Sequence, residues 1–203
     1  FLHLPAPLLA IQLLWVNLVT DSLPALALGV EPISDNIMKR KPVQPKQSVF
    51  AGGAGFSIII EGCFIGALSL LAYTIGRVFF DFPGTEPVVG RTMAFAVLSL
   101  SQLAHTFNMR SQQSIFKLSP FSNPKLLWAA LVCILLQISV IVIEPLSYIF
   151  KTVPLTGGQW GIVTALSVLP LLVVELEKKF FPKGNAQKKC IRSKNCKIRF
   201  PKI

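Results

Sequence analysis

Apolar residues gather in long blocks along this chain, and polar residues are concentrated in the segments between the blocks. Five blocks are mostly apolar, at about residues 7–30, 50–80, 92–109, 124–143 and 157–177. A helix needs roughly 20 mostly apolar residues to cross the hydrocarbon core of a bilayer. The pattern therefore predicts an all-α fold, a polytopic membrane helix bundle with five transmembrane helices.

The third block is the weakest of the five. Its apolar core runs from Met93 to Ala104 and is interrupted by Ser99, Ser101 and Gln102. Polar side chains at membrane depth need partners within the protein, because the hydrocarbon core holds no water. We therefore expect neighbouring helices to shield this span from lipid.

The composition supports a membrane location. The chain is 52% hydrophobic and only 14% charged, and its mean hydropathy is +0.61. An average soluble domain has about 25% charged residues. An ordinary soluble domain is therefore excluded.

The positive charge of the chain follows the proposed spans. Of the basic residues, all except Arg77, Arg91 and Lys151 fall around the segments after the first and third blocks or in the tail after the fifth. Basic residues near span ends accumulate on the cytoplasmic side. The net charge of +11 thus indicates a topology with a cytoplasmic C-terminus. We expect no nucleic-acid partner, because no basic face is interleaved with stacking aromatic residues.

The chain divides into a membrane domain, residues 1–181, and a basic tail, residues 182–203. The tail has few large apolar residues, so we expect it to be disordered and held near anionic lipid headgroups on the cytoplasmic side. Cys190 and Cys196 lie in it, but one cysteine pair without a neighbouring histidine is a poor zinc site.

Small residues within the spans have expected packing roles. Gly62 and Gly66 form a GxxxG pair, which lets helix backbones approach closely, and we expect it to pack against the first helix. Cys63 and Cys133 are expected to pack as small apolar residues.

The first span contains an unusual group of polar residues, Asn17, Thr20 and Asp21. At helical spacing these three share one face. Pro24 has no N–H for the carbonyl of Thr20, so we expect a kinked or unwound helix near Asp21–Pro24. An aspartate near the bilayer centre costs roughly 2.5 to 3.5 kcal/mol and marks an ion or proton path by default. The pattern predicts a cation site, with a structural ion pair as the alternative.

The ligand types suit a hard cation, because they are oxygens. Calcium takes six to eight oxygen ligands, more than the first span offers. The other spans add only Glu61, Gln102, His105 and Asn108 as candidates. The last three form a polar stripe that either faces the site or joins neighbouring helices. Glu61 is an accessory carboxylate or a buried hydrogen-bonding residue, and His105 is a proton shuttle or a link between helices.

The segment "QLLWVNLVTDSLPALALGVEP", residues 12–32, resembles the sixth membrane helix of P-type ATPases of the calcium-pump branch, and keeps nearly all of the pattern LLWxNLxTDxxPAxALGxxP. With weaker identity, "KRKPVQPKQSVF" resembles the following cytoplasmic loop, "EPLSYIF" the region before the last helix, and "LPLLVVELEKKFF" that helix. The resemblance covers about residues 5–181. The chain is identified as the carboxy-terminal transmembrane region of a calcium-transporting P-type ATPase, helices six to ten.

The resemblance implies roles for individual residues. The sixth helix of the family is unwound near its middle, and its Asn, Thr and Asp coordinate the transported cation, which corresponds to Asn17, Thr20 and Asp21 here. Sarcoplasmic-reticulum-type pumps add a glutamate ligand from the eighth helix, where this chain has Gln102. The resemblance therefore implies metal ligands Asn17, Thr20, Asp21 and Gln102, and one Ca2+ per cycle instead of two.

The resemblance also implies partners that are not in these residues. ATP and Mg2+ would bind to the phosphorylation and nucleotide domains, so this part alone should not hydrolyse ATP. We expect it to work with membrane lipid and with the remaining N-terminal part of the pump, in the plasma membrane. A P-type pump for Mn2+, Na+ or K+ is an open alternative, as is a stand-alone membrane transport or interaction protein without ATPase activity.

Overall fold

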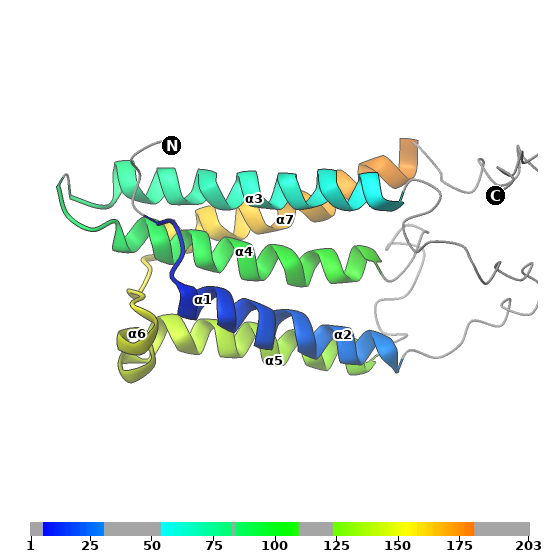
Figure 1. Cartoon of the computed structure of the whole chain (residues 1–203), viewed down its shortest axis with the longest axis horizontal. Coiled ribbons are helices and arrows are strands. Elements are labelled where there is room, and N and C mark those ends of the chain that lie inside the picture. The colour runs from blue at the N-terminus through cyan, green and yellow to red at the C-terminus, as the bar shows by residue number, and fades with distance from the viewer. Residues whose placement is uncertain (1–5, 31–53, 83, 110–123, 181–203) are drawn as a thin grey trace, which may run out of the picture.

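The structure is a computed structural model that describes residues 6–30, 54–82, 84–109 and 124–180. Every regular element in these ranges is a helix, as Figure 1 shows, which confirms the all-α prediction. The elements are α1 (Ala10–Trp15), the π-helix η1 (Val16–Asp21), α2 (Ser22–Gly29), α3 (Ala54–Phe79), α4 (Val88–Met109), α5 (Pro124–Val142), α6 (Glu144–Phe150) and α7 (Gly157–Phe180).

Four helical stretches of the described chain are long and apolar enough to cross a membrane. They are Ala10–Gly29, Ile58–Phe79, Pro124–Val142 and Gly157–Glu175. These stretches correspond to the first, second, fourth and fifth blocks of the sequence. The chain is therefore part of an integral membrane protein. The third block forms the long helix α4, which is not among the four.

The helix α4 lies at the centre of the bundle. It packs against α3 and α7 along much of its length, and against η1 and α5. The residues Met93–Val97 are at most 1% exposed, so a whole turn of α4 is covered on every side. A helix covered by protein does not need the apolar surface that lipid requires. The shielding expected for the third block is thus confirmed for the described residues.

The helices α3 and α4 form an antiparallel pair (Figure 1) with a very close approach near their connecting turn. A Cβ atom on Gly76 would overlap Gly90, and one on Gly90 would lie 2.7 Å from the carbonyl oxygen of Tyr73. The GxxxG pair is not part of this contact. Among the described residues, a Cβ on Gly62 or Gly66 would meet no atom within 4 Å. The expected packing of that pair against the first helix is therefore wrong, because α3 packs against α4 and α7 instead.

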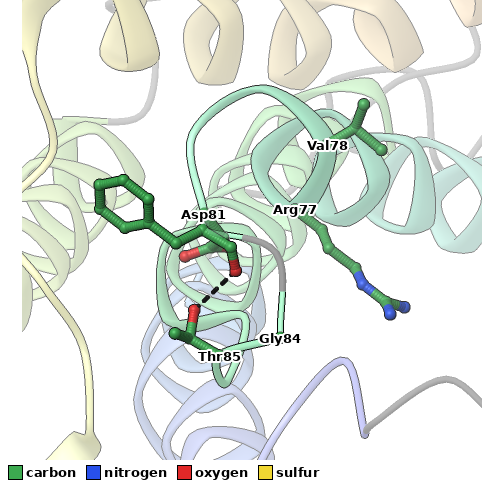
Figure 2. Close-up of a pocket in the computed structure, with 6 residues that line it drawn as sticks. Arg77, Val78, Asp81, Gly84 and Thr85 are labelled. Atoms are coloured by element: carbon green, nitrogen blue, oxygen red, sulfur yellow. Dashed lines mark hydrogen bonds between the residues drawn. The ribbon is translucent and has the colours of Figure 1, made fainter.

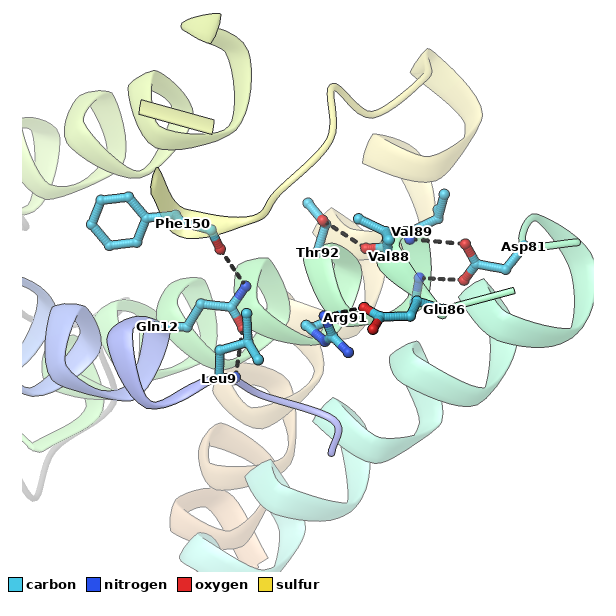
Figure 3. A network of polar contacts seen from close by, with 10 residues as sticks. Leu9, Gln12, Asp81, Glu86, Val88, Val89, Arg91, Thr92 and Phe150 are labelled. Atoms are coloured by element: carbon cyan, nitrogen blue, oxygen red, sulfur yellow. Dashed lines mark hydrogen bonds and ion pairs between the residues drawn. The ribbon is translucent and has the colours of Figure 1, made fainter. Parts of the chain in front are cut away.

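The turn between α3 and α4 is held by Asp81. Its two carboxylate oxygens accept hydrogen bonds from the backbone N–H groups of Val89, at 3.0 Å, and Gly90, at 2.9 Å. These donors belong to the first turn of α4, where backbone N–H groups have no partner in the helix (Figure 3). The negative charge also suits the positive end of the helix dipole. Asp81 thus fixes where α4 begins.

The short helix α6 anchors the first helical stretch at one end. The side-chain amide of Gln12 donates to the carbonyl oxygen of Phe150 at 3.0 Å (Figure 3), and its oxygen accepts from the N–H of Leu9 at 3.0 Å. The rings of Trp15 and Phe150 meet edge to face at 5.0 Å. The indole N–H of Trp15 donates to Gln137 of α5 at 3.1 Å. These contacts fix the helix just before it changes to the π form.

Candidate cation site

The first helical stretch changes from α to π form at Val16–Asp21. A π-helix bonds residue i to residue i+5, is rare, and often marks a functional site. The segment contains Asn17, Thr20 and Asp21, the three residues singled out from the sequence. The irregularity lies just before the expected Asp21–Pro24, and Pro24 itself is inside α2. Pro24 has no N–H that could donate to a carbonyl of the preceding turn. The hydrogen-bond pattern therefore changes in the residues just before it.

Two carbonyl groups of η1 accept hydrogen bonds from side chains. The hydroxyl of Ser22 donates to the carbonyl of Asn17 at 3.1 Å, and the thiol of Cys133 donates to the carbonyl of Val19 at 3.5 Å. Pro24 lies five residues after Val19, where a π-helix would place the missing N–H. The Cys133 thiol therefore supplies a donor where the backbone has none.

The three polar side chains of η1 do not share one environment. Asn17 and Asp21 are exposed on the surface of the described chain, whereas Thr20 is buried, with 3% exposure. The wider turn of a π-helix moves Thr20 away from the face that residues four apart share. The structure thus keeps Asn17 and Asp21 on the exposed side of the helix and turns Thr20 toward the interior of the bundle.

The fourth predicted ligand, Gln102, lies on α4, which packs against η1. Its side-chain oxygen is buried and has no hydrogen-bond partner among the described residues. A buried acceptor without a partner costs about 1 to 3 kcal/mol, so a cation or a water molecule at this oxygen would be favourable. No hydrogen bond or ion pair joins the side chains of Asn17, Thr20, Asp21 and Gln102 to one another in the described ranges.

The described chain offers a set of oxygen donors with a single carboxylate. No group of three or more His, Cys, Asp or Glu residues in the described ranges could hold a metal ion. The donors of η1 and Gln102 are therefore of the type that suits a hard cation, but they are fewer than the six to eight that calcium takes. An ion bound here needs further ligands from other groups.

Two other polar residues of the spans pair with each other. Nε2 of His105 in α4 lies 3.2 Å from Oε2 of Glu61 in α3. Of the alternatives open from the sequence, His105 therefore takes the role of a link between helices, and Glu61 that of a buried hydrogen-bonding residue. The pair lies between α3 and α4, whereas Asn17 and Asp21 lie on η1.

A pocket of about 570 Å³ lies at the turn between α3 and α4 (Figure 2). Arg77, Asp81 and Thr85 are among the residues that line it. Both carboxylate oxygens of Asp81 already accept from the backbone of α4, and the hydroxyl of Thr85 donates to the carbonyl of Phe82 at 2.8 Å. Since these groups have partners, the pocket is a feature of the turn, and it contains none of the predicted ligands.

A comparison with known protein families identifies the family of this chain. Residues 5–180 match the family described as "Cation transporting ATPase, C-terminus". The chain belongs to this family. Its identification from the sequence of the first span is confirmed.

Curated relatives of this cation-ATPase region are calcium-transporting ATPases by name. One from Bacillus subtilis (strain 168) is 44% identical over 173 residues, which cover 85% of this chain and 19% of that protein. Another from Bacillus cereus (strain ATCC 10987 / NRS 248) is 43% identical over 185 residues, covering 85% of this chain and 21% of that protein. One from Listeria monocytogenes serovar 1/2a is 35% identical over 182 residues, which cover 86% of this chain and 20% of that protein. The chain spans about a fifth of the length of these relatives.

One contact of the π-helix in this cation-ATPase region was not predicted from the sequence. Cys133 was expected only to pack as a small apolar residue, and it is indeed buried at 2% exposure. Its hydrogen bond to the carbonyl of Val19 joins α5 to the π-helix. A proline inside a helix indicates that a carbonyl will lack its backbone donor, but nothing in the sequence says which helix supplies a substitute.

Proposed function

We propose that this chain forms the ion-binding membrane part of an ATP-driven P-type pump that moves calcium out of the cytoplasm, with one Ca2+ per cycle. The observation that carries the proposal is the π-helix of Val16–Asp21, which holds a carboxylate and an amide within a stretch long and apolar enough to cross a membrane. An irregular backbone in a membrane is tolerated where it is buried in protein or lines a wet cavity. The names of the relatives support calcium as the cargo.

In this proposal each ligand has a distinct part. The carboxylate of Asp21 offsets the charge of the ion, and the side-chain oxygens of Asn17 and Gln102 replace water. Gln102 brings no charge, which supports one calcium ion and not two. The remaining oxygens come from membrane helices outside this chain.

Thr20 requires a change of conformation to join the other ligands. Its side chain is buried, whereas Asn17 and Asp21 are exposed. In an α-helix, residues three and four apart share a face, so a return of η1 to the α form would bring all three together. We propose that ion binding favours this form, and that the π form is the state with lower affinity.

The rest of the pump supplies the chemistry that this part lacks. ATP and Mg2+ act on the phosphorylation and nucleotide-binding domains, and the chain works against that N-terminal part and the surrounding lipid. The proposed location is the plasma membrane, with residues 1–181 as the membrane domain and the basic tail 182–203 in the cytoplasm near anionic lipid. That tail lies outside the described residues. No nucleic acid takes part in the proposed function.

The experiment that tests the proposal measures ATP-dependent uptake of calcium-45 into vesicles that contain the full-length pump. We compare wild type with Asp21→Asn, which removes one charge but keeps the size of the side chain. The matched control is Glu144→Gln, because Glu144 is an exposed carboxylate in the first turn of α6. We expect uptake to disappear in Asp21→Asn and to persist in the control.

The same vesicles identify the ion. Uptake of calcium-45 is measured with Mn2+, Na+ or K+ added outside, and only a transported or tightly bound competitor should reduce it. Equal calcium uptake in wild type and Asp21→Asn would remove Asp21 as a ligand. Uptake of manganese or an alkali ion in place of calcium would contradict the proposed cargo. The same variants would then test whether that ion binds at Asp21.

A further inference from the structure

The pocket at the turn between α3 and α4 contains one positive and one negative side chain. Its volume of about 570 Å³ lies within the range of about 300 to about 1,000 Å³ that is usual for ligand pockets. Arg77 and Asp81 line it together with Thr85, and Val78 and Phe82 add apolar surface. Figure 2 shows the side chain of Arg77 pointing away from the carboxylate of Asp81. The pocket thus presents two opposite charges that do not cancel by direct contact.

Arg77 has a hydrogen-bonding partner but no carboxylate partner in the described ranges. Its side chain shares a hydrogen bond with the side chain of Tyr73, one turn earlier on α3. Neither ion pair of the described chain includes Arg77, and the carboxylate of Glu86 pairs with Arg91, at 3.5 Å. A guanidinium group has five N–H donors in a planar fork that matches the oxygens of a phosphate. The charge of Arg77 is therefore available to a phosphate group in the pocket.

The pocket lies where the membrane span of α3 ends. The stretch that can cross a membrane ends at Phe79, and Arg77 lies two residues, or about 3 Å along the helix axis, before this end. Val78, Phe79 and Phe82 are 71%, 74% and 81% exposed, so apolar surface lies beside the charged groups. Aromatic rings and long cationic side chains are typical of the level of the lipid headgroups. A ligand that fits this depth has a polar headgroup and apolar chains.

The other polar groups of the pocket retain capacity for further hydrogen bonds. Each carboxylate oxygen of Asp81 accepts one backbone N–H, whereas a carboxylate has about four lone-pair positions in all. The hydroxyl of Thr85 donates to the carbonyl of Phe82, and its oxygen can still accept a hydrogen bond. A primary ammonium group brings three N–H donors. Asp81 and Thr85 therefore suit an ammonium group in the same pocket in which Arg77 suits a phosphate.

We propose that this pocket binds the headgroup of a phospholipid that carries both a phosphate and a primary ammonium group, as phosphatidylethanolamine does. The phosphate lies on the guanidinium group of Arg77, and the ammonium group lies against Asp81 and Thr85. One acyl chain follows the exposed side of α3, where Leu71 and Val78, seven residues apart, belong to one apolar stripe. The pocket and the headgroup each contain one charge of either sign, and such complementarity gives specificity.

The proposed lipid site is separate from the candidate cation site. Its residues lie at the end of α3 and in the turn that follows, and the pocket contains none of the predicted ligands Asn17, Thr20, Asp21 and Gln102. Figure 1 shows this turn at the end of the bundle opposite to the end of α7. The lipid therefore comes from one leaflet only. The proposal requires that α3 crosses a membrane, and it does not depend on which ion the pump carries.

Native mass spectrometry of the full-length pump in detergent tests the lipid site. The protein is titrated with phosphatidylethanolamine, phosphatidylcholine or phosphatidylglycerol of the same acyl chains, and the fraction with one bound lipid is measured. Phosphatidylcholine has a positive charge but no N–H donor, and phosphatidylglycerol has no positive charge. We expect phosphatidylethanolamine to reach half-saturation at the lowest concentration, about tenfold below phosphatidylglycerol, as for the gain of one charged hydrogen bond.

Two variants separate the roles of the two charges. Arg77→Gln removes the partner of the phosphate and should raise the half-saturation concentration of all three lipids by about tenfold. Asp81→Asn keeps an acceptor for the first turn of α4 but removes the negative charge, and should abolish the preference for phosphatidylethanolamine over phosphatidylglycerol. The matched control is Lys151→Gln, because Lys151 is an exposed cation at the C-terminal end of α6 and does not line the pocket. The control should bind lipid as wild type does.

Four results would overturn the proposal. Two are equal binding of phosphatidylethanolamine by wild type and Arg77→Gln, and an unchanged headgroup preference in Asp81→Asn. If the full-length pump bound no phosphatidylethanolamine, another part of the pump would cover the pocket. If the soluble headgroup glycerophosphoethanolamine bound as tightly as the intact lipid, the pocket would be a site for free phosphate compounds. The headgroup preference of wild type needs no substitution, so a variant that fails to fold leaves the test intact.

Discussion

The thiol of Cys133 in α5 donates a hydrogen bond to the backbone carbonyl of Val19 in η1, at 3.5 Å. The side chain of Cys133 is 2% exposed, so this bond is shielded from competing solvent. It joins the π-helix to a neighbouring span at the carbonyl that has no backbone donor, because Pro24 lacks an N–H. Cys133 therefore acts as a positioning residue for the helix that carries Asn17 and Asp21.

Replacement of this thiol should strengthen ion binding, because its hydrogen bond stabilises the π form, which is the proposed state with lower affinity. A net hydrogen bond contributes about 1 kcal/mol, so Cys133→Ala should lower the calcium concentration for half-maximal uptake by up to about fivefold. Cys133→Ser keeps a donor and should stay near wild type. The control is Cys63→Ala, at an exposed position of α3. The calcium dependence of uptake checks this, and equal effects of Ala and Ser at position 133 would show that packing alone matters.

The close approach of α3 and α4 predicts opposite effects for similar substitutions. Gly76→Ala would force the new Cβ into Gly90, and overpacking of this kind typically costs about 1 to 3 kcal/mol. Gly62→Ala meets no atom within 4 Å and should stabilise α3 by up to about 1 kcal/mol, because alanine favours helix. Thermal unfolding of the full-length protein in detergent measures both. A higher unfolding temperature for Gly76→Ala than for wild type would contradict the packing described.

The cap of α4 predicts a loss of stability on neutral replacement of Asp81. Asp81→Ala removes the acceptors of the N–H groups of Val89 and Gly90, and loss of a helix cap costs about 0.5 to 2 kcal/mol. Asp81→Asn keeps one good acceptor and should lose less. Thr85→Val is the control, because the hydroxyl of Thr85 bonds only to the carbonyl of Phe82. Thermal unfolding should show the largest loss of stability for Asp81→Ala, a smaller loss for Asp81→Asn and the smallest for Thr85→Val. Equal losses for Asp81→Ala and Thr85→Val would show that Asp81 does not cap α4.

Much of the fold follows from the pattern of apolar blocks, because a membrane span is set by length and hydropathy. The helices α3, α5 and α7 begin and end within a few residues of the boundaries of the predicted blocks. The short helix α6 was not predicted, since its seven residues are too few for a periodic signal. The irregular first helix was predicted from Pro24, but the π form was not, because its hydrogen bonds depend on what the neighbouring helices supply.

The candidate site was predictable in its residue types and less so in its geometry. The burial of Thr20 depends on the π form, which rotates it away from Asn17 and Asp21. The Glu61–His105 pair could have been found, because these residues lie equally far along the chain from Pro83, as do Gly76 and Gly90. In an antiparallel pair of helices, residues equally far from the turn lie side by side. The contact of Cys133 gave no such signal, since α5 is far from η1 in sequence.

The hydrogen bond between Trp15 and Gln137 predicts a cost that depends on which partner is removed. Gln137 is 1% exposed, and its side-chain nitrogen has no partner among the described residues, so Trp15 supplies the bond that its oxygen makes. Trp15→Phe removes the N–H donor, leaves that oxygen unpaired, and should cost about 1 to 3 kcal/mol. Gln137→Leu removes the buried amide altogether and should cost less, and the double variant should be no less stable than Trp15→Phe alone. Thermal unfolding of the four proteins measures this coupling, and strictly additive losses would mean that the two side chains do not interact.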